Sequence, residues 1–526
     1  MDECGREVAP EDLKSWLTDG MELALLDVRE HGQFGEGHMF LATPAPYSQL
    51  EFRVQALVPR PGTRVVVVDD NGAYLARLAC KRLAAIGYVA VFRLKGGLVA
   101  WKQAGYKVFS GVNVPSKAFG ELVEHRYNVP KISACELADL QTQGSDVVVL
   151  DGRPVPEYQK MSIPAAVCCP NGELALRATD IVKSPDTLVV VNCAGRTRSI
   201  VGAQTLIDSG IPNPVRALEN GTQGWFLEDL RLDHGASRLY PGDTSQAGVR
   251  GKQGPAQDFA KANALPTINY SQFQAWHADA DRSTYLCDIR TDEEFAASTL
   301  ALAIHAPGGQ LIQATDHYIG TRNARVVVFD TENVRAVYVA VWLKRMGLDV
   351  AVLTDASAHL HEDDQDADKP SADGVTEIGP GQLAECLAAR VPVLDLRPGM
   401  DYRRLHITGS QWSIRPMLHT LGLQGHGTVA LVVSDPRVAR LASIDLRECG
   451  VDHILVFVWD GSKLQGLACE STPSNPPDAQ CIDYLFFVHD RHDGNKEAAR
   501  RYLSWELGLL EQLDKSDLAA MQKHLN

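Results

Sequence analysis

Several features that mark secreted, membrane-spanning or disulfide-rich proteins are missing from this sequence. The first residues, MDECGREVAP, are acidic and lack the basic start and apolar core of a signal peptide. No apolar run approaches the roughly 18 residues that a membrane span requires. The eleven cysteines form no Cys-x-x-Cys pair and no zinc-type Cys/His spacing, which excludes a disulfide framework and favours reduced thiols in core positions. We therefore predict a soluble, cytoplasmic protein.

A surplus of positive charge is also missing. The formal net charge is −15 and the pI is near 5.5, so neither a nucleic acid nor an anionic membrane is expected as a partner of the whole protein. Hydrophobic residues make up 45% and charged residues 22% of the chain, as in ordinary globular proteins. At 526 residues the chain is too long for one domain of usual size. Several folded domains are therefore predicted.

Three short signatures recur along the chain and divide it into four similar repeats. In the first, an apolar strand ends in Asp-x-Arg, with the pairs Asp27 and Arg29, Asp151 and Arg153, Asp288 and Arg290, and Asp395 and Arg397. In the second, a branched apolar strand leads through a loop into an amphipathic helix that ends at a glycine, at Gly87, Gly210, Gly347 and Gly450. The third is a strand and turn ending in tryptophan, at Trp101 and Trp225, fainter at Trp459 and absent from repeat three.

The predicted fold class is α/β, with four tandem domains, each a mainly parallel sheet flanked by helices. Apolar strands that alternate with helices require a sheet covered on both faces. The predicted domains are 1–112, 125–240, 262–360 and 374–470, followed by a helical tail, 471–526, that does not match the repeat. We expect the joints near 113–130, in the Gly/Gln/Ser-rich stretch 241–257 and in the acidic stretch 361–374, because all three compositions resist burial.

Repeat two carries a cysteine in the loop between its branched strand and its helix, in the segment NCAGRTRS. Cys193 is predicted to end the strand, where the loop N–H groups and the helix dipole favour an anion. The same amides, together with Arg196 and Arg198, should lower the pKa of the thiol and make it a nucleophile. Gly195 should permit a tight turn. The simpler alternative is a buried strand-end thiol followed by solvent-facing arginines.

The other three repeats have no cysteine at this position. Counting back from the helix-ending glycine places Asp70 and Asp330 there in repeats one and three, and repeat four has Ser434 and Asp435 in a differently built loop. A carboxylate lacks the nucleophilic sulfur of a thiol and would repel an anionic substrate. These repeats are predicted to be inactive, as structural covers, as docking surfaces for an acceptor protein, or as both.

The domains resemble rhodaneses, a family of sulfurtransferases, and the chain looks like a tandem four-domain bacterial member. The resemblance rests on the Asp-x-Arg strand end, the NCAGRTRS loop and the NGTQGW segment, and it is strongest over residues 125–240. It implies that Cys193 attacks the outer sulfur of thiosulfate or a similar sulfane donor, that sulfite leaves, and that the persulfide passes its sulfur to cyanide or a thiol acceptor. It implies neither a metal nor an organic cofactor.

The predicted catalytic residue is Cys193. The predicted substrate-binding residues are those of the loop that follows it, Ala194, Gly195, Arg196, Thr197, Arg198 and Ser199. The two arginines are expected to orient the substrate and stabilise the thiolate, and the two hydroxyls to act as minor donors.

The Asp-x-Arg pair of repeat two is expected to be structural. Asp151 can cap the turn after its strand, and Arg153 can pair with an internal carboxylate such as Glu157. Trp225 is expected to lie in the core or in a pocket wall.

Three other functions stay open. Cysteine-based phosphatases and arsenate reductases use a similar anion cradle, but four residues separate Cys193 from Arg198, one fewer than in the phosphatase signature, which favours sulfur transfer. A scaffold or sulfur carrier could be built from the same modules without turnover. In the tail, His489, Asp490, His492 and Asp493 could bind a metal, although helix capping is the alternative.

Overall fold

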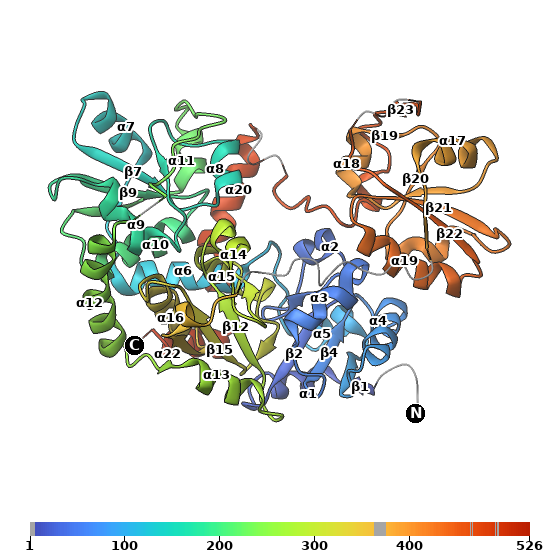
Figure 1. Cartoon of the computed structure of the whole chain (residues 1–526), viewed down its shortest axis with the longest axis horizontal. Helices are drawn as coiled ribbons and strands as arrows, with labels where there is room; N and C mark the ends of the chain where they lie inside the picture. The colour runs from blue at the N-terminus through green and yellow to red at the C-terminus, as the bar shows by residue number, and fades with distance from the viewer. Residues whose placement is uncertain are drawn as a thin grey trace.

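Four parallel sheets follow one another along the chain, with helices on their faces (Figure 1). The structure, a computed structural model, describes residues 6–242, 244–361, 375–462, 464, 466–489, 491 and 494–525. None of the helices in these ranges combines the length and the apolar character that crossing a membrane requires.

The first two domains have the same sequence of elements. Domain 1 consists of β1 (Arg6–Val8), α1 (Pro10–Trp16), β2 (Leu23–Asp27), α2 (His31–Glu36), β3 (Thr43–Pro44), α3 (Leu50–Leu57), β4 (Arg64–Val68), α4 (Tyr74–Ala85), β5 (Val91–Leu94) and α5 (Gly97–Gln103). Domain 2 consists of β6 (Lys131–Ile132), α7 (Ala134–Thr142), β7 (Val147–Asp151), α8 (Val155–Lys160), β8 (Val167–Cys168), α9 (Leu174–Ile181), β9 (Leu188–Asn192), α10 (Thr197–Asp208), β10 (Val215–Leu218) and α11 (Gly221–Leu227).

The second two domains repeat this pattern with variations. Domain 3 consists of β11 (Thr267–Ile268), α13 (Tyr270–His277), β12 (Thr284–Asp288), α14 (Asp292–Ala297), β13 (Ile304–His305), α15 (Gly308–Gln313), β14 (Thr321–Arg322), β15 (Arg325–Phe329), α16 (Arg335–Arg345) and β16 (Asp349–Leu353). Domain 4 consists of β17 (Thr376–Glu377), α17 (Pro380–Ala388), β18 (Val393–Asp395), α18 (Gly399–Arg404), β19 (His406–Ile407), β20 (Gln411–Trp412), β21 (Thr428–Val433), α19 (Pro436–Glu448) and β22 (His453–Val458).

One strand order is common to the four sheets. It is β6-β10-β9-β7-β8 in domain 2, and domains 3 and 4 repeat it as β11-β16-β15-β12-β13 and β17-β22-β21-β18-β20. Domain 1 has the equivalent order, and β14 of domain 3 adds to its β2 as an antiparallel neighbour. The predicted fold class, four mainly parallel α/β sheets with helices after them, is therefore confirmed.

The central strand of domain 2 shows why these segments are almost wholly apolar. Val189 and Val191 of β9 pack into the core cluster that also contains α10, whereas Val190 points to the opposite face, against Trp225. Because helices cover both faces, both sets of alternating side chains are buried. The strand ends at the polar Asn192, which brings the chain to the carboxyl edge of the sheet.

Each Asp-x-Arg signature forms a buried ion pair at the end of its strand. In domain 2, Arg153 donates from Nε to Asp151 over 2.9 Å and from Nη2 over 2.7 Å, and Nη2 also donates to the carbonyl of Met161. The same three contacts recur in the other domains, where the carbonyl belongs to Gly37, Ser298 or Leu405. Arg153 thus pairs with an internal carboxylate, as predicted, but this carboxylate is Asp151, and Glu157, the example that we gave, binds Arg198.

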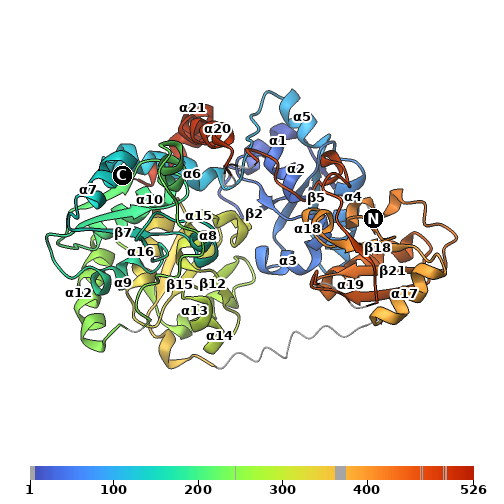
Figure 2. The ribbon, with the colours of Figure 1, turned by 90° about the horizontal axis from the view of Figure 1, so that it is seen from above.

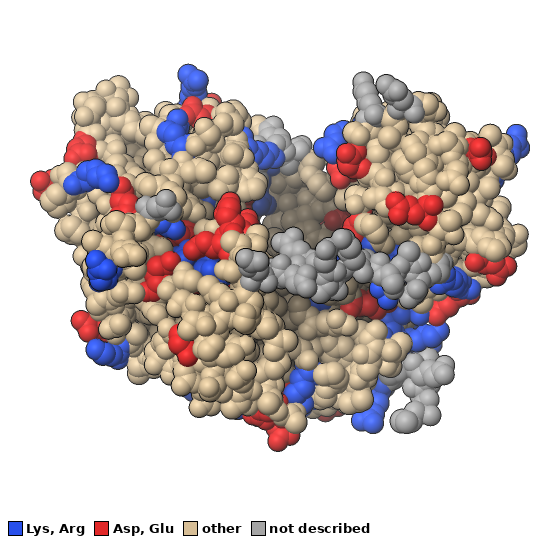
Figure 3. All heavy atoms as spheres, in the orientation of Figure 1, with Lys and Arg blue, Asp and Glu red and all other residues tan. Residues whose placement is uncertain are grey.

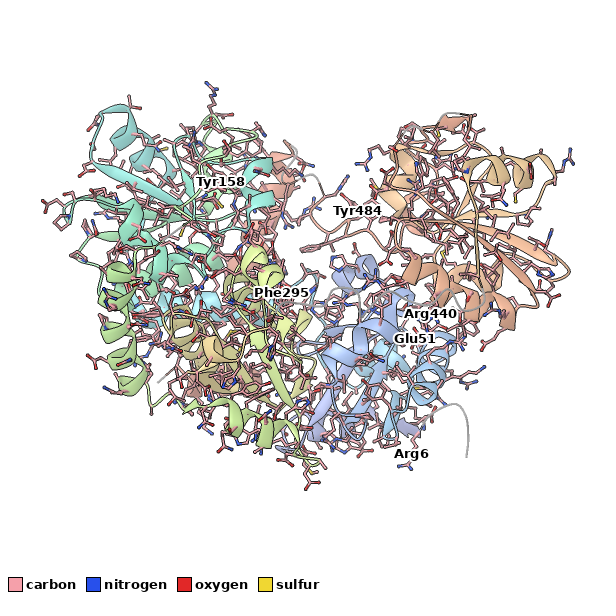
Figure 4. The ribbon with its side chains drawn as sticks, in the orientation of Figure 1. Arg6, Glu51, Tyr158, Phe295, Arg440 and Tyr484 are labelled. Carbon is pink, nitrogen blue, oxygen red and sulfur yellow. The ribbon has the colours of Figure 1, made fainter. Side chains whose placement is uncertain are left out.

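The domains pack as two pairs, 2 with 3 and 1 with 4 (Figures 1 and 2). A single hydrophobic cluster spans domains 2 and 3, where the indole of Trp342 donates to the Thr205 hydroxyl over 2.8 Å. Domains 1 and 4 meet at an ion-pair cluster: Arg415 of domain 4 binds Glu51, labelled in Figure 4, and Asp445, and Arg82 of domain 1 also binds Asp445.

The expectation that the first two joints resist burial was wrong. The first is the helix α6 (Val114–Tyr127), which is largely buried, and the second is the helix α12 (Gln246–Ala262), which is buried in part. Ala256 and Ala260 of α12 are buried against domain 3, since small side chains one turn apart let two helices approach closely. The acidic joint lies almost wholly outside the described residues.

The C-terminal tail returns from domain 4 to domain 2. After β23 (Cys469–Glu470) it crosses domain 1, where the Gly32 N–H donates to the Ile482 carbonyl over 2.9 Å. In Figure 4 the segment with Tyr484 runs between domain 4 and the rest of the molecule, where the surface is hollowed (Figure 3). The tail then forms α20 (Lys496–Leu507), α21 (Leu509–Gln512) and α22 (Lys515–Lys523).

The cluster between domains 1 and 4 predicts the effect of Arg415→Ala. The Arg415 side chain is fully buried, and removing it leaves Glu51 and Asp445 in a desolvated interface with Arg82 as their remaining counter-charge. The free energy of unfolding of this pair should fall by about 3–5 kcal/mol, measured by urea denaturation followed by tryptophan fluorescence. Arg404→Ala, which breaks an exposed pair with Asp401, is the control and should change it by less than about 1 kcal/mol. Equal midpoints for the two variants would contradict the prediction.

Candidate active site

Cys193 lies at the carboxyl edge of the domain 2 sheet. Asp151 of β7 is in register with Asn192 of β9, so Cys193 is the first residue beyond the ladder. Residues 194–196 connect it to α10, which begins at Thr197. The edge at which parallel strands end is where ligands bind in open α/β sheets. The Cys193 side chain is only 2% exposed, which places the thiol inside the protein rather than on its surface.

The turn between β10 and α11 holds the Cys193 loop in place. The backbone N–H and the hydroxyl of Thr222 both donate to the Cys193 carbonyl, over 2.8 and 3.0 Å, and the Gln223 N–H donates to the Ala194 carbonyl over 3.1 Å. Gly221 has φ of +53°, and a Cβ there would lie 2.3 Å from the Cys193 carbonyl oxygen. Only glycine fits this close approach, which explains the glycine of the NGTQGW signature. Its tryptophan, Trp225, lies in α11 and is buried in the core.

Arg198 and Ser199, on the first turn of α10, act on the thiol. The positive charge of Arg198 and the polar hydroxyl and N–H of the nearby Ser199 each lower the pKa of the Cys193 thiol. Both Arg198 terminal nitrogens bind the Glu157 carboxylate of α8, over 2.9 and 2.7 Å. This two-point contact fixes the plane of the guanidinium beside the sulfur.

Our expectation that the thiol pKa would lie below its ordinary value was wrong. Burial disfavours the charged thiolate and raises the pKa of Cys193, and this effect exceeds the opposing effects of Arg198 and Ser199. The carboxylate of Glu506 raises the pKa further. The free protein therefore holds Cys193 mainly as a neutral thiol near pH 7.

The other loop residues point in different directions. The Arg196 guanidinium turns away from the sulfur and binds Glu121 and Glu124 of α6. The Thr197 hydroxyl donates to Glu506 of the tail over 3.0 Å. Gly195 has no positive φ, and its missing Cβ instead makes room for the tail, because a Cβ there would lie 3.0 Å from the Glu506 carboxylate and 3.2 Å from the Tyr502 ring.

Helix α20 of the tail covers the Cys193 loop and supplies site residues that the sequence did not reveal. Tyr502 and Glu506, one turn apart, both face the loop and are almost fully buried. In Figure 1 this helix lies beside α8 and α11 of domain 2. The four-residue spacing of the two side chains marked a helix face, but nothing in the sequence placed that face against residues 193–197.

A cavity of about 290 Å³ lies beside the thiol, and we call it the Cys193 cavity. Positive residues dominate its lining, which includes Lys117 of α6, Arg198 and Arg491 of the tail. The Lys117 ammonium lies over the rings of Tyr502 and Trp505, and burial lowers its pKa to about 7. A desolvated cavity with this lining favours a small anion.

The predicted tail metal site lies largely outside the described residues, because Asp490, His492 and Asp493 are among those that the structure does not describe. Elsewhere in the described ranges, no group of three His, Cys, Asp or Glu side chains is arranged to hold a metal ion.

The loops of the other domains hold carboxylates or apolar groups where domain 2 has its thiol. By strand register the counterpart of Cys193 in domain 1 is Asp69, one residue before the predicted Asp70, because the loop there is one residue longer. In domain 3 it is Asp330, as predicted, and in domain 4 it is Val433. Asp69 accepts the Ala76 N–H over 2.9 Å and Asp330 the Arg335 N–H over 2.9 Å, so each carboxylate occupies its own loop's amides.

Comparisons with known proteins agree with this architecture. The family model of the rhodanese-like domain matches residues 9–104, 133–228 and 270–357, more than half of the chain. A thiosulfate sulfurtransferase from Pseudomonas aeruginosa, known from a crystal structure, is 38% identical, with 98% of this chain and 99% of that chain covered and a TM-score of 0.90.

Shorter relatives match single domains. A sulfurtransferase of Allochromatium vinosum is 28% identical over 102 residues, which are 19% of this chain and 92% of that protein. An uncharacterized protein of Synechocystis is 30% identical over 108 residues, 20% of this chain and 58% of that protein. The predicted resemblance is confirmed, and the chain belongs to the rhodanese family.

Proposed function

We propose that this protein is a thiosulfate sulfurtransferase in which domain 2 alone performs the reaction. The observation that carries the proposal is the Cys193 thiol at the carboxyl edge of the sheet, beside a small cavity whose lining holds more cations than carboxylates. The similarity over nearly the whole chain to the thiosulfate sulfurtransferase of Pseudomonas aeruginosa supports the same activity. The short loop between Cys193 and Arg198 favours sulfur transfer over phosphatase chemistry.

In the first half of the reaction, thiosulfate enters the Cys193 cavity with its oxygens toward the positive residues. Arg198 and Lys117 attract the dianion. The Cys193 thiolate then attacks the outer sulfur of thiosulfate, the S–S bond of the donor breaks, and sulfite leaves with the electron pair of that bond. The outer sulfur becomes the terminal atom of a Cys193 persulfide, and the amides at the start of α10 stabilise its negative charge.

In the second half, cyanide or a thiol takes the terminal sulfur and the Cys193 thiolate is released. In each half a nucleophile takes the sulfane sulfur, and the leaving group keeps the electron pair of the broken bond. The electrons therefore balance without a cofactor. Domains 1, 3 and 4 are proposed to be inactive in this reaction, because a carboxylate or a valine replaces the thiol. Domain 3 helps to wall the domain 2 site, and domains 1 and 4 contact the tail that lies across it.

The first prediction concerns Cys193→Ser. This variant should fold normally and lose sulfur transfer from thiosulfate to cyanide entirely, because a hydroxyl does not attack sulfane sulfur under these conditions. Mass spectrometry of the wild type after thiosulfate treatment should show one added sulfur atom on the Cys193 peptide, lost again with cyanide. Cys135→Ser removes an exposed thiol on α7 and is the matched control, with wild-type turnover. Transfer by Cys193→Ser would refute the assignment.

The second prediction separates the two loop arginines. Arg198→Ala should raise the KM for thiosulfate by roughly 10- to 100-fold, the loss expected for hydrogen bonds to a charged group, in a steady-state cyanide assay. Arg198→Lys keeps the charge without the planar fork and should give a smaller increase. Arg196→Ala should raise KM less than Arg198→Ala and mainly lower stability, because Arg196 joins α10 to α6. Equal KM increases for both alanine variants would contradict this prediction and would indicate that Arg196 also binds the substrate.

The third prediction concerns pH. The neutral thiol dominates below the pKa of Cys193 and the thiolate above it, so alkylation of the free enzyme by iodoacetamide should accelerate with pH up to a pKa above that of ordinary cysteine. Since Arg198 lowers this pKa, Arg198→Ala should move the alkylation profile to still higher pH. Monitoring alkylation of the Cys193 peptide by mass spectrometry checks both. A profile centred below the ordinary cysteine pKa would contradict the effect of burial.

A further inference from the structure

Lys117 of α6 is buried in the wall of the Cys193 cavity without an ion pair. The residue is 5% exposed and lines the cavity together with Cys193. Its Nζ atom donates one hydrogen bond, to the Val112 carbonyl over 2.8 Å, and forms no ion pair with any carboxylate of the described residues. A lysine is rarely buried in this way unless it is paired with a carboxylate. The free protein therefore holds this side chain in a place that is unfavourable for its charge.

The packing of α6 on the Cys193 loop fixes this position. Helix α6 packs against α10 (Figure 1), and Gly120, one turn after Lys117, lies against Thr197, where a Cβ would be 2.8 Å from the threonine side chain. Glu121, the next residue of α6, binds Arg196 of the loop. Lys117 therefore cannot move out to solvent unless these contacts between α6 and the loop break.

Two aromatic rings of α20 cover the Lys117 nitrogen. Nζ lies 5.1 Å from the centre of the Tyr502 ring and 4.7 Å from that of the Trp505 ring. Such contacts favour the ammonium, but they replace only part of the hydration that it loses. Burial has the larger effect and lowers the pKa of Lys117 to about 7. Near pH 7 the free protein therefore contains both the amine and the ammonium form of this side chain.

Charged groups of the surrounding elements act on Lys117 in both directions. Those that favour its ammonium are Glu506 of α20 and Asp316 of domain 3, and those that disfavour it are Arg198 of α10 and Arg491 of the tail. His38 of domain 1 also faces Lys117, but burial lowers the pKa of His38 to about 3, so that its imidazole is neutral near pH 7. An anion in the cavity adds a further interaction that favours the ammonium.

A dianion that enters the cavity changes the protonation of Lys117. Charges interact strongly where water is largely excluded, and a nearby negative charge raises the pKa of a lysine. The ammonium therefore becomes the stable form when thiosulfate is bound. Since binding and protonation favour each other, thiosulfate that binds above about pH 7 takes up a proton from solvent. The cavity then receives one net negative charge instead of two.

We propose that Lys117 is a proton-coupled binding residue for the sulfur donor, an inference that rests on the proposed sulfurtransferase function. Thiosulfate enters the Cys193 cavity together with one proton from solvent. The proton forms an N–H bond at Nζ, and the resulting ammonium binds the oxygens of the dianion. When sulfite has left, Nζ returns the proton to solvent, so that the amine is restored for the next donor.

The test measures proton uptake by isothermal titration calorimetry of Cys193→Ser, which can bind thiosulfate but cannot take its sulfur. At each pH, titrations in two buffers of different ionisation enthalpy give the number of protons taken up per bound thiosulfate. Uptake should increase from about 0.1 proton at pH 6 to about 0.9 at pH 8, and Kd should rise about tenfold between pH 8 and pH 9. Absence of uptake at pH 8 would overturn the proposal.

Two substitutions in the Cys193→Ser background identify the group that takes the proton. Lys117→Arg keeps a charge that does not titrate, so it should bind thiosulfate with less than about 0.2 proton taken up at pH 8 and with nearly the same Kd at pH 8 and pH 9. Lys117→Met keeps an apolar chain against the two rings and should bind thiosulfate at least tenfold more weakly at pH 6, without uptake. Lys261→Met, which removes an exposed lysine of α12, is the matched control and should leave uptake unchanged.

The outcomes separate this inference from the proposed function. Uptake at pH 8 that persists in both Lys117 variants would assign the proton to another group and overturn the inference. Binding at pH 6 and the melting temperature from tryptophan fluorescence show whether each variant keeps the folded site. The proposed function is tested independently, by the sulfur atom added to Cys193 of the wild type, and its absence would refute that function itself.

Discussion

The reaction that we propose requires one sulfur, that of Cys193, to become negatively charged in a place from which water is excluded. Burial makes the Cys193 thiolate unfavourable, and the charge of Arg198 with the donors of Ser199 only partly offsets this. In the proposed reaction the positive residues of the site therefore stabilise mainly the dianionic donor and then the Cys193 persulfide, since a persulfide is ordinarily more acidic than a thiol. In the thiol-free loops of domains 1 and 3 the amides already hold the carboxylates of Asp69 and Asp330, so no substrate anion can use them.

Several parts of the chain contribute to the Cys193 cavity. Domain 2 supplies the Cys193 thiol, but its cavity is completed by α6, by domain 3 through Gln310 and Gln313, and by the tail. Domains 1 and 4 contact the tail, which crosses α2 and α18 before it reaches the Cys193 loop. The walls of the Cys193 cavity thus come from more than one copy of the fold.

Local signals were sufficient to predict the repeat and the place of Cys193 at the end of its strand. Asp-x-Arg pairs, helix-ending glycines and the NCAGRTRS loop are each contiguous in sequence, and the Asp151–Arg153 ion pair joins residues only two positions apart. The partners of Arg196 and Arg198 could not be predicted, since Glu121 and Glu157 meet them only after α6 and α8 have packed. The upward shift of the Cys193 pKa comes from burial of the thiol, which could not be predicted from the sequence. Counting back from the helix-ending glycine gave Asp70 instead of Asp69, because the loop between strand and helix is one residue longer in domain 1 than in domain 2.

The contact between Thr197 and Glu506 joins residues 309 positions apart in the chain, and this separation has a consequence for biosynthesis. A ribosome completes domain 2, including its cysteine, long before α20 emerges. During that interval the Cys193 loop lacks its cover and lies open to oxidants and to unrelated thiols. The order of translation therefore sets a period in which the nascent enzyme is chemically vulnerable, and folding of the returning tail ends it.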